Sequence, residues 1–195
     1  MVGRDTVMKE LRAHVADKLE ELDGVLALRR TEIGTAPYLF QTGDDLSSLV
    51  LEPRYALGKI VSMLQERYPE ARFGIVVRGC DSRALVEMVK REQVAPDRLY
   101  LLGVACTAEE AGACYCADPA PNPENWPQAE VFGTPVESAP PHPLVAGYEE
   151  MSLEERRAFW RQQFLKCIKC CLLYTSDAAD ELDGVGLGGR RIIKK

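Results

Sequence analysis

Six cysteines, all downstream of residue 79, are the residues best suited to chemistry. A seventh, Cys171, is treated below with the C-terminal tail. In a reducing compartment, clustered cysteines indicate metal or redox chemistry more than disulfides. Four thiolates suit either an iron–sulfur cluster or structural zinc, because both bind soft sulfur ligands. The six are Cys80, Cys106, Cys114, Cys116, Cys167 and Cys170.

Two of these cysteines follow apolar runs that are typical of buried parallel strands. The runs at 73–77 and 99–104 flank a predicted helix at 84–91, and this spacing predicts a parallel βαβ unit. Ligand sites in such sheets lie beyond the carboxyl ends of the strands. We therefore expect the thiols of Cys80 and Cys106 to meet at one edge of the sheet.

Cys114 and Cys116 form an i, i+2 pair, which in an extended segment would point both thiols the same way. Together with the two cysteines at the strand ends, this pair predicts one site with four sulfur ligands. We expect Cys80, Cys106, Cys114 and Cys116 to hold one 4Fe–4S cluster.

Three alternatives remain open at this point. The same thiols could hold zinc in a structural or interaction module. Cys106 alone could be a small buried hydrophobe. Cys80 could be the nucleophile of a thiol-dependent enzyme, because a helix N-terminus favours a thiolate. This third alternative is the weakest, since the chain has only two histidines, His14 and His142, expected on a surface helix and in a proline-rich arm.

The order of strand and helix patterns around these residues predicts a single α/β domain over residues 1–166. Its sheet should be mainly parallel with flanking helices, and the βαβ unit at 73–104 should lie at its centre. Residues 31–45 mix turn residues with a small apolar island at 38–40. The other predicted helices lie at 5–22, at 55–68 and after a Ser152–Glu155 capping box. A strand is predicted at 25–28 and a turn at 79–82. An irregular arm at 119–143 should wrap the outside and hold one strand at 130–132.

The composition excludes several classes of protein. Hydrophobic residues make up 46% of the chain, charged residues 28%, and the net charge is -6, as in ordinary soluble globular proteins. An acidic chain without a Lys/Arg stripe is a poor nucleic-acid binder. No apolar run approaches the roughly 18 residues that a membrane span needs. The N-terminus lacks the apolar centre of a signal peptide, so we expect a cytoplasmic protein.

Four stretches resemble a known family: VVRGCDSRAL (76–85), DRLYLLGVACT (97–107), CYC (114–116) and QFLKCIKC (163–170). They are similar to the C-terminal domain of the β subunits of deazaflavin (coenzyme F(420))-linked hydrogenase and formate dehydrogenase. Related iron–sulfur subunits of sulfhydrogenase and anaerobic sulfite reductase share the pattern. The resemblance covers most of residues 25–170.

The resemblance implies an iron–sulfur electron-transfer subunit of an anaerobic oxidoreductase complex of the hydrogenase, formate dehydrogenase or heterodisulfide reductase kind. Its partners would be other subunits of a redox complex or a ferredoxin. Cys167 and Cys170 would begin a ferredoxin-like 4Fe–4S domain. No further cysteine of that ladder follows in the expected spacing, so we expect a second cluster only in a longer, untruncated protein. The residues show no flavin or deazaflavin signature, and a flavin is left open.

The end of the chain is excluded from this interpretation. Residues 171–195 can be written in codons that resemble a transposase adapter from sequencing libraries, so we expect a non-native tail; the alternative is a genuine flexible tail. Gly184, Gly186 and Gly189 match G-x-G-x-x-G, but neither the strand nor the helix of a dinucleotide site surrounds them.

Overall fold

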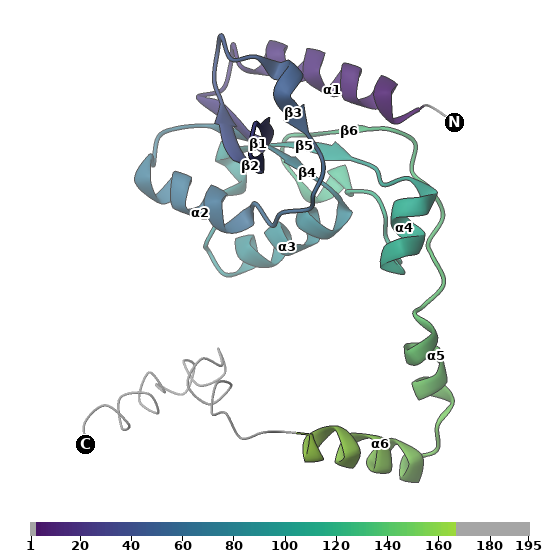
Figure 1. The fold of residues 1–195 in the computed structure, drawn as a ribbon. Helices are drawn as coiled ribbons and strands as arrows, with labels where there is room; N and C mark the ends of the chain where they lie inside the picture. The colour runs from purple at the N-terminus through teal and green to yellow at the C-terminus, as the bar shows by residue number, and fades with distance from the viewer. Residues whose placement is uncertain (1–2, 167–195) are drawn as a thin grey trace, which may run out of the picture. The chain divides into compact units, whose positions relative to one another are not determined.

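One six-stranded sheet forms the centre of the protein in the computed structural model, which describes residues 3–166 (Figure 1). The strand order is β2-β1-β4-β5-β6, and β3 also pairs with β1. The parallel strands are β1 (Gly24–Thr31), β4 (Phe73–Val77), β5 (Leu99–Val104) and β6 (Ala129–Phe132). The antiparallel strands, both against β1, are β2 (Gly34–Phe40) and β3 (Leu49–Val50). The predicted α/β class with a mainly parallel sheet is confirmed.

The βαβ unit at the centre of the sheet is also confirmed. β4 and β5 are parallel neighbours whose register begins with Phe73 opposite Leu99. Every residue of both strands is buried, because helices cover both faces of the sheet at this point. The connecting helix is α3 (Gly79–Lys90).

Two apolar clusters attach helices to opposite faces of the sheet. On one face, Leu11 and Val15 of α1 (Arg4–Lys18) pack with strand residues that include Phe40. On the other face, Val61 of α2 (Gly58–Arg67) and Leu85 of α3 belong to a second cluster. Each such fully buried side chain contributes about 1.5–3 kcal/mol of apolar burial. With both faces covered, polar groups are left to the ends of the strands.

β2 forms a hairpin with β1 that the sequence did not predict. Only the apolar island at 38–40 was predicted here, within turn-rich residues, and Pro37 argues against a central strand. In the structure Pro37 pairs opposite Leu28, and β2 is the edge strand of the sheet. An edge strand tolerates the missing N–H of proline, while Gly34, with φ of 146°, turns the chain back.

α3 begins earlier than predicted. The residues predicted as a turn, 79–82, are the first turn of the helix. The Asp81 carboxylate accepts a hydrogen bond from the backbone N–H of Arg78 at 3.2 Å, which satisfies a donor at the start of the helix. Ser82 is buried and accepts a hydrogen bond from the indole N–H of Trp126 at 3.1 Å. Cys80 therefore lies inside the first turn of α3.

The predicted arm at 119–143 contributes to the sheet and its core. The strand predicted at 130–132 is confirmed as part of β6, and Trp126 belongs to the same apolar cluster as α2 and α3. A helix that was not predicted, α4 (Ala108–Cys114), precedes the arm. Three short 3-10 turns complete the connections: η1 (Leu46–Ser48), η2 (Pro96–Arg98) and η3 (Pro123–Asn125).

The chain divides into two compact units at the His142–Pro143 boundary, and the predicted domain of residues 1–166 spans both. The second unit contains α5 (Pro143–Glu150) and α6 (Leu153–Leu165). α6 begins with the capping box predicted at Ser152 and Glu155. Within residues 3–166, none of the helices has both the length and the apolar character that a bilayer crossing requires. Cys167, Cys170 and the predicted tail at 171–195 lie outside the described residues.

Candidate functional site

The first four cysteines of the chain line one cavity of about 280 Å³. The cavity lies at the carboxyl ends of β4 and β5, because Cys80 follows the first of these strands and Cys106 the second. The structure therefore brings Cys80, Cys106, Cys114 and Cys116 around a common space. The other lining residues are Arg54, Arg83, Glu110, Tyr115, Ala117 and Asp118.

The two cysteines at the strand ends differ in exposure. Cys80 is exposed in the first turn of α3, whereas the Cys106 residue is only 8% exposed. The backbone N–H of Cys106 donates to the carbonyl of Pro119 at 2.9 Å. This bond attaches the end of β5 to the start of the arm, so Cys106 forms a fixed inner wall of the cavity.

The prediction that Cys114 and Cys116 lie in an extended segment is wrong. Cys114 is the last residue of α4, and Tyr115 adopts a left-handed conformation with φ of 49° and ψ of 44°. Left-handed backbone is unfavourable for a residue with a side chain and clusters at functional sites. The Cys116 N–H donates to the Ala111 carbonyl at 3.0 Å. The pair is therefore placed by the end of a helix.

A capping box in the sequence marks the start of α4. Thr107 and Glu110 form a capping box, in which Thr107 Oγ1 accepts from the Glu110 N–H at 3.2 Å. The Glu110 carboxylate accepts in return from the Thr107 N–H at 2.6 Å. The T-x-x-E spacing predicts a helix start, and a helix from 108 carries Cys114 toward the cavity.

Two arginines contact the thiols, and sequence reasoning missed both. Arg54 donates to Cys114 Sγ, and this contact raises the pKa of Arg54. Arg83 Nη2 lies 3.9 Å from Cys116 Sγ. Burial opposes the charge of Arg83, but its contacts with Cys116 and Asp118 outweigh burial and raise its pKa. Arg83 lies three residues after Cys80 in α3, so helical spacing could have found it, whereas no local pattern points to Arg54.

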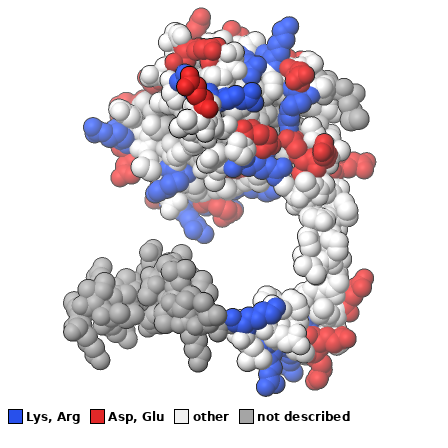
Figure 2. Space-filling model, viewed as in Figure 1, with Lys and Arg blue, Asp and Glu red and all other residues white. Residues whose placement is uncertain are grey.

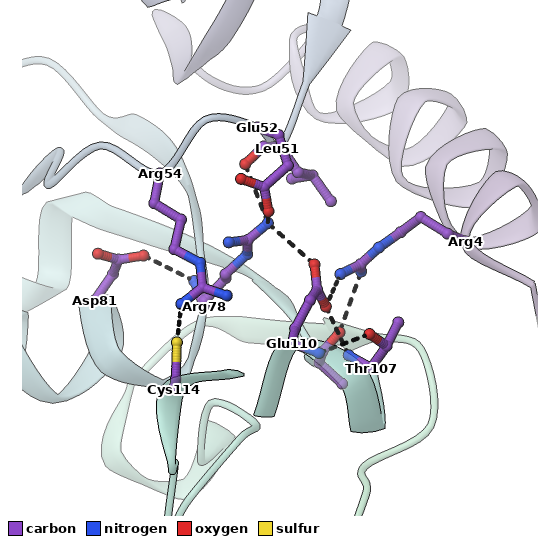
Figure 3. A network of polar contacts seen from close by, with 10 residues as sticks. Arg4, Leu51, Glu52, Arg54, Arg78, Asp81, Thr107, Glu110 and Cys114 are labelled. Atoms are coloured by element: carbon purple, nitrogen blue, oxygen red, sulfur yellow. Dashed lines mark hydrogen bonds and ion pairs between the residues drawn. The ribbon is translucent and has the colours of Figure 1, made fainter. Parts of the chain in front are cut away.

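A buried ion network adjoins the cavity (Figure 3). The Arg78 side chain is 6% exposed, and its Nη2 lies 2.6 Å from Glu52 Oε1 and 3.3 Å from Glu110 Oε1. The same nitrogen donates to the Leu51 carbonyl at 3.1 Å, and Arg4 pairs with Glu110 from α1. The network thus ties α1, the 51–54 loop, the start of α3 and α4 together.

Within the described residues, the Glu110 carboxylate has compensating partners, whereas Nη1 of the buried Arg78 has no hydrogen-bond partner. Burial alone would raise the pKa of Glu110, but hydrogen bonds from Thr107 and Arg4 and the charge of Arg78 lower it. Glu110 is therefore ionised at neutral pH. A buried charge is stable only when it is paired and hydrogen-bonded, so this network holds the elements that carry Cys80, Arg54 and Cys114 in a defined arrangement.

Neither thiol at the strand ends has the lowered pKa of a nucleophilic cysteine. Burial and the neighbouring Asp81 raise the pKa of Cys80, despite its place at a helix N-terminus. Burial also raises the pKa of Cys106. Nucleophilic cysteines need a lowered pKa. A metal centre, in contrast, supplies the positive charge that removes the thiol proton on binding.

The four thiols that line the cavity are soft ligands of the kind that both structural zinc and iron–sulfur clusters bind. Zinc bound by four thiolates at about 2.3 Å would bring the sulfurs to roughly 3.8 Å from one another. Across the described part of the chain, no three His, Cys, Asp or Glu side chains are close enough to hold one metal ion.

Acidic and basic side chains are interspersed over the visible face of the first unit (Figure 2). The cavity itself combines thiols with the cationic Arg54 and Arg83 and the acidic Glu110 and Asp118. Arg83 Nη1 contacts Asp118 at 3.1 Å. Arginines thus contact both acids of the cavity as well as the thiols of Cys114 and Cys116.

Comparison with known proteins connects part of the chain to an oxidoreductase subunit. No protein-family model matches the chain. Over 87 residues, 44% of this chain, it is 32% identical to the F(420)-dependent formate dehydrogenase 1 subunit beta of Methanococcus maripaludis. The match spans about a fifth of that subunit's length, 22%. The chain is therefore similar, in part, to a subunit of a redox enzyme.

Proposed function

We propose that this chain is an iron–sulfur electron-transfer subunit of an anaerobic oxidoreductase complex. Cys80, Cys106, Cys114 and Cys116 would hold one 4Fe–4S cluster. The observation that carries the proposal is the convergence of four thiols on one cavity at the carboxyl edge of the sheet. The partial similarity to a formate dehydrogenase subunit supports the same class of function.

When bound, the cluster would supply one-electron transfer. The residues of the chain have distinct parts in this proposal. Cys106 is the buried inner ligand, and Cys80 and Cys114 are the exposed ones, nearest to an incoming donor. Electrons would enter and leave on that exposed side. The ion network around Arg78 fixes the spacing of the ligand-bearing elements, so little reorganisation would accompany electron transfer.

The proposed partners are other subunits of a redox complex or a ferredoxin. Cys167 and Cys170 would ligate a second 4Fe–4S cluster only in a longer protein that continues the cysteine ladder. A cytoplasmic location fits this proposal, because free thiols persist in a reducing compartment. The proposal involves no nucleic acid, and it does not depend on a flavin.

Anaerobic purification of the full chain tests this function. We expect brown protein that contains iron and acid-labile sulfide. Serine variants of Cys80, Cys106, Cys114 and Cys116 should each lose most of the iron. A double serine variant of Cys167 and Cys170 is the matched control, and it should keep the iron. Colourless wild-type protein, or loss of iron only in the control, would reject the proposal.

The same preparation separates the two other interpretations. One zinc per chain without sulfide would indicate a structural or interaction module. Metal-free protein whose Cys80 is alkylated much faster than its other thiols would indicate a thiol-dependent enzyme. The raised pKa of Cys80 argues against this last outcome.

A further inference from the structure

Two guanidinium groups approach the cysteine cavity from separate elements, and each reaches a different thiol. Arg54 comes from the loop between β3 and α2 and contacts Cys114, sixty residues further along the chain. Arg83 comes from α3 and points toward Cys116. Figure 3 shows the Arg54 guanidinium beside the Cys114 sulfur. The two sulfurs that α4 and its end bring to the cavity are therefore each next to a fixed positive charge.

Arg83 is held in place by Asp118, which leaves one nitrogen for the thiol. Its Nη1 donates to the Asp118 carbonyl at 2.7 Å and lies 3.1 Å from the Asp118 carboxylate. The second nitrogen, Nη2, lies 3.9 Å from Cys116 Sγ. The Arg83 side chain is 47% exposed, so water screens its charge, and we expect its influence on the cavity to be modest.

Arg54 has a more direct contact with its thiol than Arg83 has. It lines both the cysteine cavity and an adjacent cavity of about 120 Å³, which Cys80 and Asp81 also line. Its hydrogen bond to Cys114 and the nearby carboxylate of Glu52 favour its protonated state. Arg54 is thus a permanent cation among three thiols, and it should act more strongly on the site than Arg83.

A positive charge beside a ligand sulfur acts on the electron that a cluster receives. One electron from a reductant such as dithionite makes the cluster and its thiolates more negative by one charge. Hydrogen bonds and cations near the sulfurs stabilise this more negative state and raise the reduction potential. The effect needs no contact with the iron atoms, because it acts through the sulfur ligands.

We propose that Arg54 and Arg83 are positioning residues that raise the reduction potential of the cluster by donating to Cys114 and Cys116. The inference rests on the proposed function. It adds that two arginines beside the ligand sulfurs set the reduction potential of the cluster, and that Arg54 has the larger effect. The potential, and not the amount of iron, is the property that these residues control.

A redox titration of the anaerobically purified full chain tests this inference, with dithionite as the reductant. In Arg54→Gln, we expect the ratio of reduced to oxidised cluster at a fixed potential to fall about tenfold. For a one-electron couple this corresponds to a midpoint potential lower by about 59 mV. Arg83→Gln should lower the ratio less, roughly threefold, because its contact is longer and more exposed.

Arg72→Gln is the matched control, because it removes the same charge at the amino end of β4, where Arg72 contacts Gln128. Its potential should stay at the wild-type value. Arg54→Lys keeps the charge without the planar fork and should fall between wild type and Arg54→Gln. The Arg83 variant tests the inference independently of the Arg54 variants. Because the Arg83 side chain is exposed, it can be replaced even if Arg54→Gln fails to fold.

The outcomes distinguish failure of the inference from failure of the proposed function. A wild-type chain without a cluster would overturn both. A loaded wild-type chain whose potential matches those of Arg83→Gln and the folded Arg54 variants would overturn the inference and leave the cluster in place. An equal shift in Arg72→Gln would show a general charge effect and would also overturn it.

Discussion

The two edges of the parallel sheet are built in different ways. At the amino edge, short reciprocal hydrogen bonds join the segments that enter the strands. The backbone N–H of Asp23 donates to the Arg72 carbonyl at 2.9 Å, and the Asp23 carboxylate accepts from the Arg72 backbone N–H at 2.8 Å. The buried Gln65 side chain bonds both backbone groups of Ala95, at 3.0 and 2.9 Å. At this edge, backbone groups that enter the strands are paired with each other or with the Asp23 and Gln65 side chains.

At the carboxyl edge, charged residues and thiols replace these reciprocal bonds. Arg78 follows β4 directly and is buried among carboxylates, while Cys80 and Cys106 face a cavity of about 280 Å³. Ligands in parallel sheets gather at this edge. The comparison indicates that the amino edge contributes to the stability of the fold, whereas the carboxyl edge also forms the cysteine cavity. Substitutions at the amino edge should therefore change stability alone, and those at the carboxyl edge should also change the cavity.

The largest loss of unfolding free energy is expected for Arg78→Met. This change leaves Glu110 without one of its two arginine partners and removes the bond to Leu51. Breaking a mostly buried pair should cost about 3 kcal/mol of unfolding free energy, measured by urea denaturation. Cluster loading should fall with it. Glu52→Gln is the control and should have a much smaller effect, because the Glu52 side chain is 59% exposed. A stable Arg78→Met protein with full loading would contradict the role of the network.

Gly79→Ala should have the next largest effect. A Cβ at Gly79 would lie 2.7 Å from the Asp118 carbonyl and 2.9 Å from the Ala120 carbonyl. Backbone cannot yield as a side chain can, so we expect a loss of about 2 kcal/mol and reduced iron content, as Asp118 and its neighbour Cys116 shift.

Gly74→Ala, near the amino end of β4, is the comparison for Gly79, which follows the carboxyl end of the same strand as the first residue of α3. A Cβ at Gly74 would meet side-chain atoms of Val25 and Leu22. Its cost should appear in stability, measured by urea denaturation, without a change in iron per folded chain. If Gly74→Ala lost iron as fully as Gly79→Ala, the distinction between the two edges would not hold.

Gln65→Leu tests the amino edge by itself. The change removes two hydrogen bonds and leaves the Ala95 N–H without its partner, while the Ala95 carbonyl keeps only the 3.4 Å bond from the Arg98 N–H. We expect a cost of about 2 kcal/mol. Thermal unfolding should show this loss. Iron content and midpoint potential should match the wild type when both are measured on folded protein, and a shifted potential would show that the amino edge also controls the site.

The smallest expected effect on unfolding free energy is that of Glu110→Gln, and it should depend on pH. Its hydrogen bonds hold the pKa of Glu110 below the usual 4.5. A lowered pKa contributes stability that is present above pH 4.5 and is lost as the pH falls through the folded-state pKa. Wild type should exceed Glu110→Gln by about 1 kcal/mol at pH 7. The two unfolding free energies should converge below pH 4.5, and a constant difference down to pH 3 would contradict the assignment.

Local sequence patterns determined the central elements of this fold. Continuous apolar runs predicted β4 and β5, and their parallel pairing was confirmed with Phe73 opposite Leu99. The Ser152–Glu155 capping box marked the start of α6. These features could be predicted because each depends on a few neighbouring residues, and because a strand–helix–strand segment of this length has few ways to pack. The places of Cys80 and Cys106 after their strands follow from the same rule.

Only the tertiary structure decided how the cavity is completed. Pairing with β1 made a strand of residues 34–40, where only an apolar island at 38–40 had been predicted. α4 and the left-handed Tyr115 placed Cys114 and Cys116, where an extended pair had been predicted. Arg54 reached Cys114 across sixty residues, and Arg78 joined the 51–54 loop to Glu110 of α4. Such contacts form between segments distant in the chain, so their energies depend on packing that no local pattern of residues contains.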